Sequence, residues 1–326
     1  MDNLERKIEN IFIQAEMSGA IVIVEALSDR QIYTQLADKF ASQVGVTIYP
    51  ANYFEECNAD NCENVIQAIR ILQDGFNEDA DNLKHVLGII DRDSTAYQNP
   101  EKWVEINQLK GLLILRYYSI ETYFVTSNNL SQVICAFTKA IPTDISATFL
   151  AELEKTFKES QEILYYMGLD ALMTHCQEGK FFNKWWSNLR FDKMKKGLEV
   201  AKKCSCLIFT QDTKQHKAFK KIKKTFGGIE AFNAEHLGRK KNDLDKFAFQ
   251  NKISASQIKE IVSGKWYLLH YVKTIHEELK KQKHPSIFAY KVKGIDENHL
   301  YHQIMNYFDP KEFEDIIKRL KQLKIN

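Results

Sequence analysis

Two short apolar runs that end in acidic residues constrain the fold of this chain most strongly. The first, IVIVEALSD, covers residues 21–29, and the second, GIIDRD, covers residues 88–93. Each is rich in Ile or Val and is followed by a helical pattern, which is typical of a buried strand in a parallel sheet. In open α/β sheets, ligands bind at the carboxyl ends of such strands. The acidic residues expected to converge at this edge are Glu25, Asp29, Asp91 and Asp93.

This concentration of carboxylates predicts a divalent metal site. Like charges repel at neutral pH unless a cation lies between them, and oxygen ligands suit Mg²⁺ or Mn²⁺. Asp91 and Asp93 would point to the same side of an extended segment and bind a first ion. Glu25 would complete that shell or act as general acid or base, and Asp29 would help to bind a second ion. Two ions about 4 Å apart would activate water and stabilise the leaving oxygen in phosphodiester cleavage.

The rest of the first half alternates between strand and helix patterns. Strands are predicted at residues 21–24, 46–49, 85–90 and 112–115. Helices are predicted at residues 29–40, with Ser28 as the N-cap, and at residues 64–72. This alternation predicts a doubly wound α/β unit with right-handed crossovers.

Glu121 follows the last of these strands, within the aromatic sequence YYSIETYFV. Ser119 is placed to cap a short helix that starts there, and a glutamate in the first turn of a helix interacts favourably with its N-terminus. The alternative is that Glu121 is a fifth carboxylate of the metal site. The residue pattern alone leaves both interpretations open.

These motifs carry a family resemblance. A glutamate that ends one strand and an Asp-x-Asp that ends another resemble the TOPRIM domain of topoisomerases, primases, OLD-type nucleases and small RNases, with Glu25, Asp91 and Asp93 at the matching positions. The segments VEALSDRQIY, NCENVIQAI, GIIDRD and YYSIETYFV resemble more closely the TOPRIM nuclease effectors of bacterial anti-phage systems, in particular the PARIS system. One departure is Ala26, where many relatives have glycine, because alanine does not tolerate positive φ as glycine does.

The resemblance implies a Rossmann-like TOPRIM domain with a parallel sheet over residues 1–129 and a mostly α-helical, lysine-rich domain over residues 130–326. It favours Glu121 as a metal ligand. It also implies a toxic nuclease that cleaves tRNA, an ABC-type ATPase sensor that holds it inactive until a phage trigger arrives, and a homodimer after release. Two alternatives stay open: an OLD-like DNA nuclease, and a TOPRIM module that binds metal and partner without cutting. Topoisomerase and primase activities are not expected, since the chain lacks a winged-helix region with a nucleophilic tyrosine and a zinc-binding domain.

Charge is distributed unevenly along the chain. Residues 1–130 contain 20 acidic and 10 basic residues, a net charge of −10, whereas residues 131–326 contain 23 and 35, a net charge of +12. An acidic half that holds cations, joined to a basic half, predicts a polyanionic substrate. Ordinary solvated helix faces are the alternative explanation.

The basic residues are densest between Lys180 and Lys224, where the sequence contains 14 Lys or Arg residues and only 3 Asp or Glu residues. Lysines neutralise phosphates without reading sequence, and rings such as Trp185 and Trp186 stack on bases unless they belong to a helix core. Lys293 lies in a lysine-glycine turn that resembles one in related effectors. The lysines predicted to contact nucleic acid are Lys217, Lys220, Lys221, Lys223, Lys224 and Lys293.

The second half is predicted to be mainly helical, with long helices at residues 145–175, 183–202 and 256–281 and one short apolar run at 204–209. No run of 18 apolar residues and no signal-peptide pattern is present, so no membrane span is expected. The six scattered cysteines lack zinc-ribbon spacing and predict reduced thiols in the cytoplasm. No Walker loop occurs, so nucleotide hydrolysis by this chain is not expected.

Overall fold

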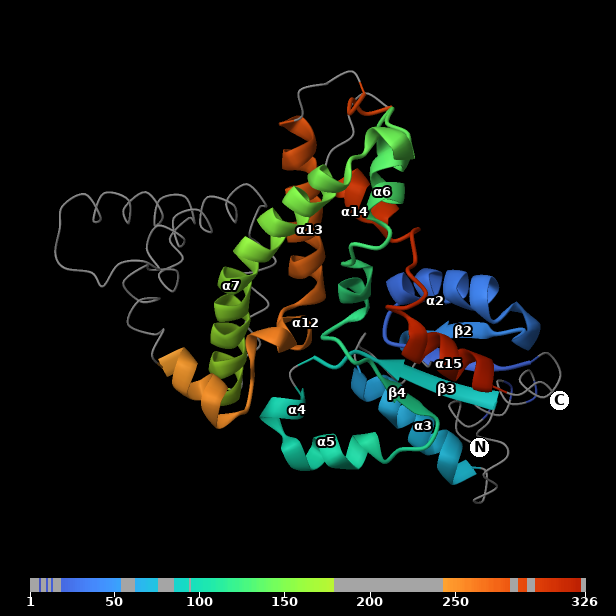
Figure 1. Cartoon of the computed structure of the whole chain (residues 1–326). Helices are drawn as coiled ribbons and strands as arrows, with labels where there is room; N and C mark the ends of the chain where they lie inside the picture. Colours follow the sequence, from blue (N-terminus) through green and yellow to red (C-terminus); the bar gives the residue numbers. More distant parts are fainter. Residues whose placement is uncertain are drawn as a thin grey trace. The chain divides into compact units, whose positions relative to one another are not determined.

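The computed structural model describes residues 19–53, 62–75, 85–93, 95–178, 243–281, 287–291 and 297–323, together with Arg6, Asn10 and Ile13 (Figure 1). The chain forms two compact units. Unit 1 comprises residues 1–129 and 304–326, and unit 2 comprises residues 130–303. The division after residue 129 lies where the sequence places a domain boundary, but residues 304–326 return to unit 1. This return depends on contacts between residues far apart in the sequence, which local patterns do not encode.

Unit 1 is built on a four-stranded parallel sheet, and this confirms the predicted α/β class. The strands are β1 (Ile21–Val24), β2 (Thr47–Pro50), β3 (Val86–Ile90) and β4 (Leu112–Ile114), in the order β2-β1-β3-β4. The chain leaves β1 toward β2 on one side and leaves β3 toward β4 on the other. The two central strands therefore form the topological switch point, the place where open α/β sheets bind ligands.

Helices cover both faces of this sheet. The connecting helices are α2 (Leu27–Phe40), α3 (Cys62–Gly75), α4 (Thr95–Gln98) and α5 (Pro100–Asn107), with 3-10 turns η1 (Ser42–Val44) and η2 (Ala51–Tyr53) beside β2. One face packs against α3 and α5 and forms an aliphatic core that includes Ile21, Ile23, Val65, Ile66, Ile69, Leu72, Val86, Ile90 and Ile106. Gly88 of β3 lets α3 approach closely, because a Cβ at this position would lie 2.7 Å from the Ile69 side chain. Helix α2 lies on the other side of the sheet (Figure 1).

The end of unit 1 is completed by two segments that lie far apart in the sequence. The 3-10 helix η4 (Ile120–Phe124) follows β4, and α15 (Glu314–Gln322) packs against α2. The rings of Phe308 and Phe313, just before α15, contact the ring of Phe124, with centroids 5.4 and 5.1 Å apart. The C-terminal segment is therefore part of the core of unit 1.

The described part of unit 2 is helical apart from one isolated bridge between Thr138 and Tyr290. Its labelled elements are α6 (Leu130–Phe137), η5 (Pro142–Asp144), α7 (Ala147–Glu178), η6 (Ala255–Gln257), α12 (Ile258–Ile261), α13 (Gly264–Lys280) and α14 (Glu297–Ile304), and residues 243–250 are also helical. The long helix predicted at residues 145–175 is confirmed as α7.

The helix predicted at residues 256–281 is instead interrupted. Val262 takes an extended conformation, with φ −98° and ψ 129°, so that α12 ends there. Ser263, with φ −47° and ψ 127°, also leaves the helical conformation and becomes the N-cap of α13. The patterns at residues 183–202 and 204–209 lie outside the described residues. Within the described ranges, none of the helices has the length and apolar character needed to cross a membrane.

Candidate metal centre

Glu25 and Asp91 lie together at the carboxyl ends of the two central strands. Glu25 directly follows β1, and Asp91 directly follows β3, its parallel neighbour. The backbone N–H of Asp91 donates a hydrogen bond of 2.7 Å to Oε1 of Glu25. The two strands whose acidic ends the sequence singles out thus bring these residues into direct contact at the switch point.

Asp29 lies in the first turn of α2 and is held by its own segment. Its Oδ2 accepts a hydrogen bond of 3.2 Å from the Ala26 backbone N–H, and its Oδ1 accepts one of 3.3 Å from the Ser28 hydroxyl. The N-cap of α2 is Ala26, so the prediction that Ser28 caps this helix is wrong. Ala26 has φ −133° and ψ 161°, an extended conformation open to every residue, and alanine therefore causes no strain at this position.

Asp93 adopts a conformation that the sequence pattern does not predict. Strand β3 ends at Ile90, and Asp93 has φ 44°, in the left-handed region that non-glycine residues rarely occupy. The expectation that Asp91 and Asp93 point to the same side of an extended segment therefore rests on a wrong premise. The Asp93 backbone N–H donates a hydrogen bond of 3.0 Å to the carbonyl of Tyr118, which joins this turn to the segment after β4.

Glu121 is a buried carboxylate, only 9% exposed, in η4. Ser119 is the N-cap residue, as predicted, but its side chain makes no capping bond to the backbone; its hydroxyl donates a hydrogen bond of 2.6 Å to Oε2 of Glu121. The structure thus places Glu121 on a short helix after β4. A buried carboxylate with a neighbouring hydroxyl is compatible with both the capping and the ligand interpretations.

The charges of these acids act on one another. Burial, followed by the negative charge of Asp93, raises the pKa of Glu25 to about 8, and Asp29 and Glu121 contribute in the same direction. The hydrogen bond from the Asp91 amide opposes this rise only in part. Burial, followed by the charges of Glu25 and Asp93, holds the pKa of Asp91 well above its ordinary value. All five predicted acids therefore belong to one electrostatic cluster, which we call the acid edge.

Three further side chains border the acid edge, and the sequence analysis missed them. Burial, followed by the charges of Asp91 and Asp29, raises the pKa of Tyr33 in α2, and burial with the charges of Asp93 and Asp91 raises that of Tyr118. Tyr33 lies four residues after Asp29 and so on the same helix face, a spacing that would have indicated it.

Cys62, the first residue of α3, is the third of these side chains. Burial, then the charge of Glu25, raises the pKa of its thiol to about 12. It therefore stays a protonated, weakly nucleophilic thiol at neutral pH. No local pattern indicates Cys62, because only the packing of α3 against the sheet brings it here.

The acid edge is not a ready-made metal-binding group. Among the described residues, no set of three or more His, Cys, Asp or Glu side chains is arranged to hold a metal ion. In this arrangement Glu25, Asp29 and Glu121 each accept a hydrogen bond from the protein. Binding a cation here would require carboxylate side chains to turn from these bonds toward a shared ion.

The predicted nucleic-acid contacts lie elsewhere in the chain. Lys217, Lys220, Lys221, Lys223, Lys224 and Lys293, like Trp185 and Trp186, lie outside the described residues. Their assignment to substrate binding stays a prediction.

The chain was compared with known proteins by sequence. No protein-family model matches it, and no curated protein resembles it at a significant level. The TOPRIM resemblance of the motifs therefore enters the functional argument as a hypothesis.

Proposed function

We propose that the chain is a metal-dependent phosphodiesterase of the TOPRIM type that binds Mg²⁺ or Mn²⁺ at the acid edge and cleaves nucleic acid. The observation that carries this proposal is the placement of Glu25 and Asp91 at the switch point of a parallel sheet, in contact with each other and with strongly raised pKa values. Perturbed acids in such a position are candidates for a functional site. A cation would favour their charged forms and offset their mutual repulsion.

The residues present fit a hard divalent cation. The donors at the acid edge are carboxylate oxygens, the ligands that Mg²⁺ and Mn²⁺ prefer. Asp91, Asp93 and Glu25 would hold a first ion, and Asp29 and Glu121 a second. When bound, such an ion supplies Lewis-acid activation of water and of the phosphate.

Glu25 would either complete the shell of the first ion or act as general acid or base. Its pKa of about 8 belongs to the protein without a cation, and a bound cation would lower it. Tyr33 and Tyr118 remain protonated, because their raised pKa values keep the phenol neutral at neutral pH, so neither adds a negative charge to the acid edge.

The proposed substrate is tRNA, and the proposed setting is anti-phage defence of the PARIS type. The support is the motif resemblance together with the basic composition of the second half of the chain. Phosphate contacts by lysines give affinity, and a folded RNA can be selected by shape and by unstacked loop bases. An ABC-type ATPase sensor would hold the nuclease inactive, and the released chain would act as a homodimer in the cytoplasm.

Expression of the chain alone tests this proposal. Induction should stop bacterial growth, and total RNA from those cells should contain a tRNA broken at one position. The Glu25→Ala variant should express to the same level without toxicity and leave the tRNA intact.

The alternative functions give different results in the same experiment. Intact tRNA with fragmented chromosomal or plasmid DNA would replace the tRNA proposal by an OLD-like DNA nuclease. Arrested growth with both nucleic acids intact would favour a TOPRIM module that binds without cutting.

A further inference from the structure

The stretch between β4 and α6, residues 115–129, contacts the acid edge on one side and the C-terminal segment, residues 304–326, on the other. On the first side, the carbonyl of Tyr118 accepts a hydrogen bond of 3.0 Å from the Asp93 backbone N–H, and Ser119 donates to Glu121. This short stretch carries one acid, Glu121, and is bonded directly to the backbone of another, Asp93. Its position therefore determines where Asp93 and Glu121 lie.

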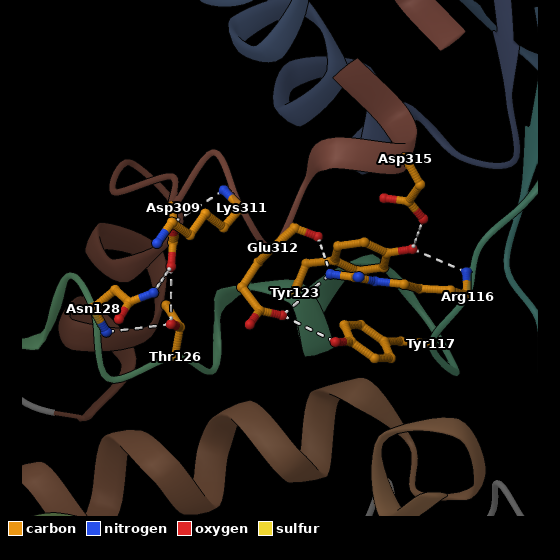
Figure 2. Close-up of polar contacts among 9 residues, drawn as sticks. All are labelled: Arg116, Tyr117, Tyr123, Thr126, Asn128, Asp309, Lys311, Glu312 and Asp315. Atoms are coloured by element: carbon orange, nitrogen blue, oxygen red, sulfur yellow. Dashed lines mark hydrogen bonds and ion pairs between the residues drawn. The ribbon is translucent and has the colours of Figure 1, made fainter. Parts of the chain in front are cut away.

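On the other side, two carboxylates of the C-terminal segment hold the same stretch (Figure 2). The guanidinium of Arg116 donates to the backbone carbonyl of Glu312 and lies 3.4 Å from Oε2 of the same residue. The hydroxyl of Tyr117 donates to this Oε2 over 3.0 Å. Glu312 thus holds two consecutive residues at the start of the stretch.

Asp315, in the first turn of α15, holds the middle of the stretch. Its Oδ2 accepts a hydrogen bond of 2.8 Å from the hydroxyl of Tyr123, and this hydroxyl in turn accepts one of 2.9 Å from the Arg116 backbone N–H. Tyr123 is fully buried, and its ring contacts those of Tyr117 and Phe313 with centroids 4.8 and 5.2 Å apart. A buried hydroxyl with both a donor and an acceptor partner has a fixed orientation and fixes its neighbours in turn.

We propose that Glu312 and Asp315 are positioning residues of the metal centre, which act through Arg116, Tyr117 and Tyr123 on the stretch that carries Glu121 and is bonded to Asp93. This rests on the proposed function, because it assigns a role in the metal site of unit 1. The C-terminal segment, although separated from the acid edge by more than 170 residues of sequence, belongs to the working site. Groups one step removed from metal ligands determine ligand orientation, and their loss typically costs about 10- to 100-fold in metal affinity or activity.

The test measures Mn²⁺ binding to the full chain by isothermal titration calorimetry, at a temperature where every variant is folded. Glu312→Ala and Asp315→Ala should each weaken Mn²⁺ binding by about 10-fold. Glu314→Ala is the matched control, since Glu314 is an exposed acid between them in the sequence and should leave the affinity unchanged. With an RNA substrate, the two variants should lower kcat at saturating substrate with little change in KM, because the substrate-contacting lysines are untouched.

Two milder variants keep the test decisive where alanine weakens folding. Tyr123→Phe keeps the ring and removes the hydroxyl, and Asp315→Asn keeps the size of the side chain. Tyr123→Phe removes the donor of this hydrogen bond and Asp315→Asn removes the charge of its acceptor. Because both changes act on the same bond, the double variant should lose no more Mn²⁺ affinity than the weaker-binding single variant. A loss of thermal stability with unchanged Mn²⁺ affinity would show a purely structural role and overturn the inference. Absence of Mn²⁺ binding by the wild-type chain would overturn the proposed metal site itself, and equal binding by wild type and variants would overturn this inference alone.

Discussion

Unit 1 contains two groups of carboxylates whose pKa values are shifted in opposite directions. At the acid edge, Glu25 and Asp91 face other acids, and burial with mutual repulsion raises their pKa values. At the C-terminal segment, Asp309 is surrounded by donors: the side chains of Thr126 and Asn128 donate to Oδ2 over 3.1 and 2.6 Å, and the Lys311 N–H donates to Oδ1 over 3.1 Å. Although burial opposes it, these hydrogen bonds, the Asn128 bond first, hold the pKa of Asp309 below its ordinary value.

The difference between the two groups lies in their donors and not in their depth. Asp309 is 7% exposed, whereas Glu25 and Asp91 are half-buried, so the least exposed of these three carboxylates is the one whose pKa is lowered. A carboxylate that receives three hydrogen bonds stabilises the fold in its charged form. Carboxylates that face one another lower the stability of the fold until a proton or a cation joins them. Such a cost is expected at a functional site and not in a purely structural part of the fold.

The largest expected effect concerns catalysis by the acid edge. Glu25→Gln and Asp91→Asn keep the size of each side chain and remove its charge. Each should reduce cleavage by at least about 10³-fold, since the metal ion they would hold supplies several kcal/mol of transition-state stabilisation. The measurement is single-turnover cleavage of RNA in Mg²⁺ or Mn²⁺.

Asp309→Asn, from the other group of carboxylates, is the comparison: cleavage should fall by no more than about 10-fold, because the hydrogen bonds of Asp309 are to Thr126, Asn128 and Lys311 and it is not a proposed metal ligand. Full activity in folded Glu25→Gln protein would remove the functional distinction between the two groups.

A second, smaller effect distinguishes whether metal ions or lysine side chains neutralise the carboxylates of the acid edge. Replacing Lys220, Lys221, Lys223 and Lys224 by Gln should weaken RNA binding and reduce the slope of log K against log salt by about 0.7 for each phosphate that a lysine no longer neutralises. Mn²⁺ affinity should not change, because the acids are proposed to pair with metal and not with these lysines. The control replaces the exposed Lys318 and Lys321 of α15 and should leave both quantities unchanged. Altered Mn²⁺ affinity with an unchanged salt slope would mean that the lysines neutralise the acids directly.

The sequence predicted the sheet well because buried parallel strands leave a strong local signal. Strand β1 is found at the expected residues 21–24, and the other strands agree within one residue at each end. The strand ends place Glu25 and Asp91 without further information. Local periodicity fails where a residue outside the pattern decides the conformation, as when Asp29 accepts the Ala26 N–H or when Asp93 enters the left-handed region.

The return of the C-terminal segment to unit 1 could not be predicted from local patterns. Glu312 and Asp315 look like ordinary surface acids near the start of an amphipathic helix. Only their hydrogen bonds with Tyr117 and Tyr123, almost two hundred residues earlier in the sequence, show otherwise. Cys62 and Tyr118 were missed as neighbours of the acid edge for the same reason.

The smallest expected effect is on the pH dependence of metal-free stability, where the two groups of carboxylates should differ in sign. The pKa of Glu25 is about 8 in the folded protein and 4.5 as its ordinary value, so the folded state binds this proton more tightly than the unfolded state does. The free energy of unfolding should therefore fall as pH rises from about 4.5 to about 8. Glu25→Gln cannot ionise and should be more stable than the wild type at pH 8.5 by on the order of 1 kcal/mol, less than the full pKa difference because this edge is partly solvated. The two proteins should differ little at pH 4.

Asp309→Asn should show the reverse. Its carboxylate has a lowered pKa, so its stabilisation is present above about pH 4 and disappears as pH falls through the folded-state pKa. The variant should be less stable than the wild type by about 2 kcal/mol at pH 8.5, the typical contribution of hydrogen bonds to a charged group, and this difference in stability should become smaller in acid.

Urea unfolding in EDTA between pH 4 and 8.5, followed by circular dichroism, measures both variants. Mn²⁺ in place of EDTA should stabilise the wild type and Asp309→Asn more than Glu25→Gln, because a ligand stabilises only the folded state that binds it. Parallel pH profiles for wild type and Glu25→Gln would show that the acids of the edge do not compete for protons, and the contrast between the two groups would fail.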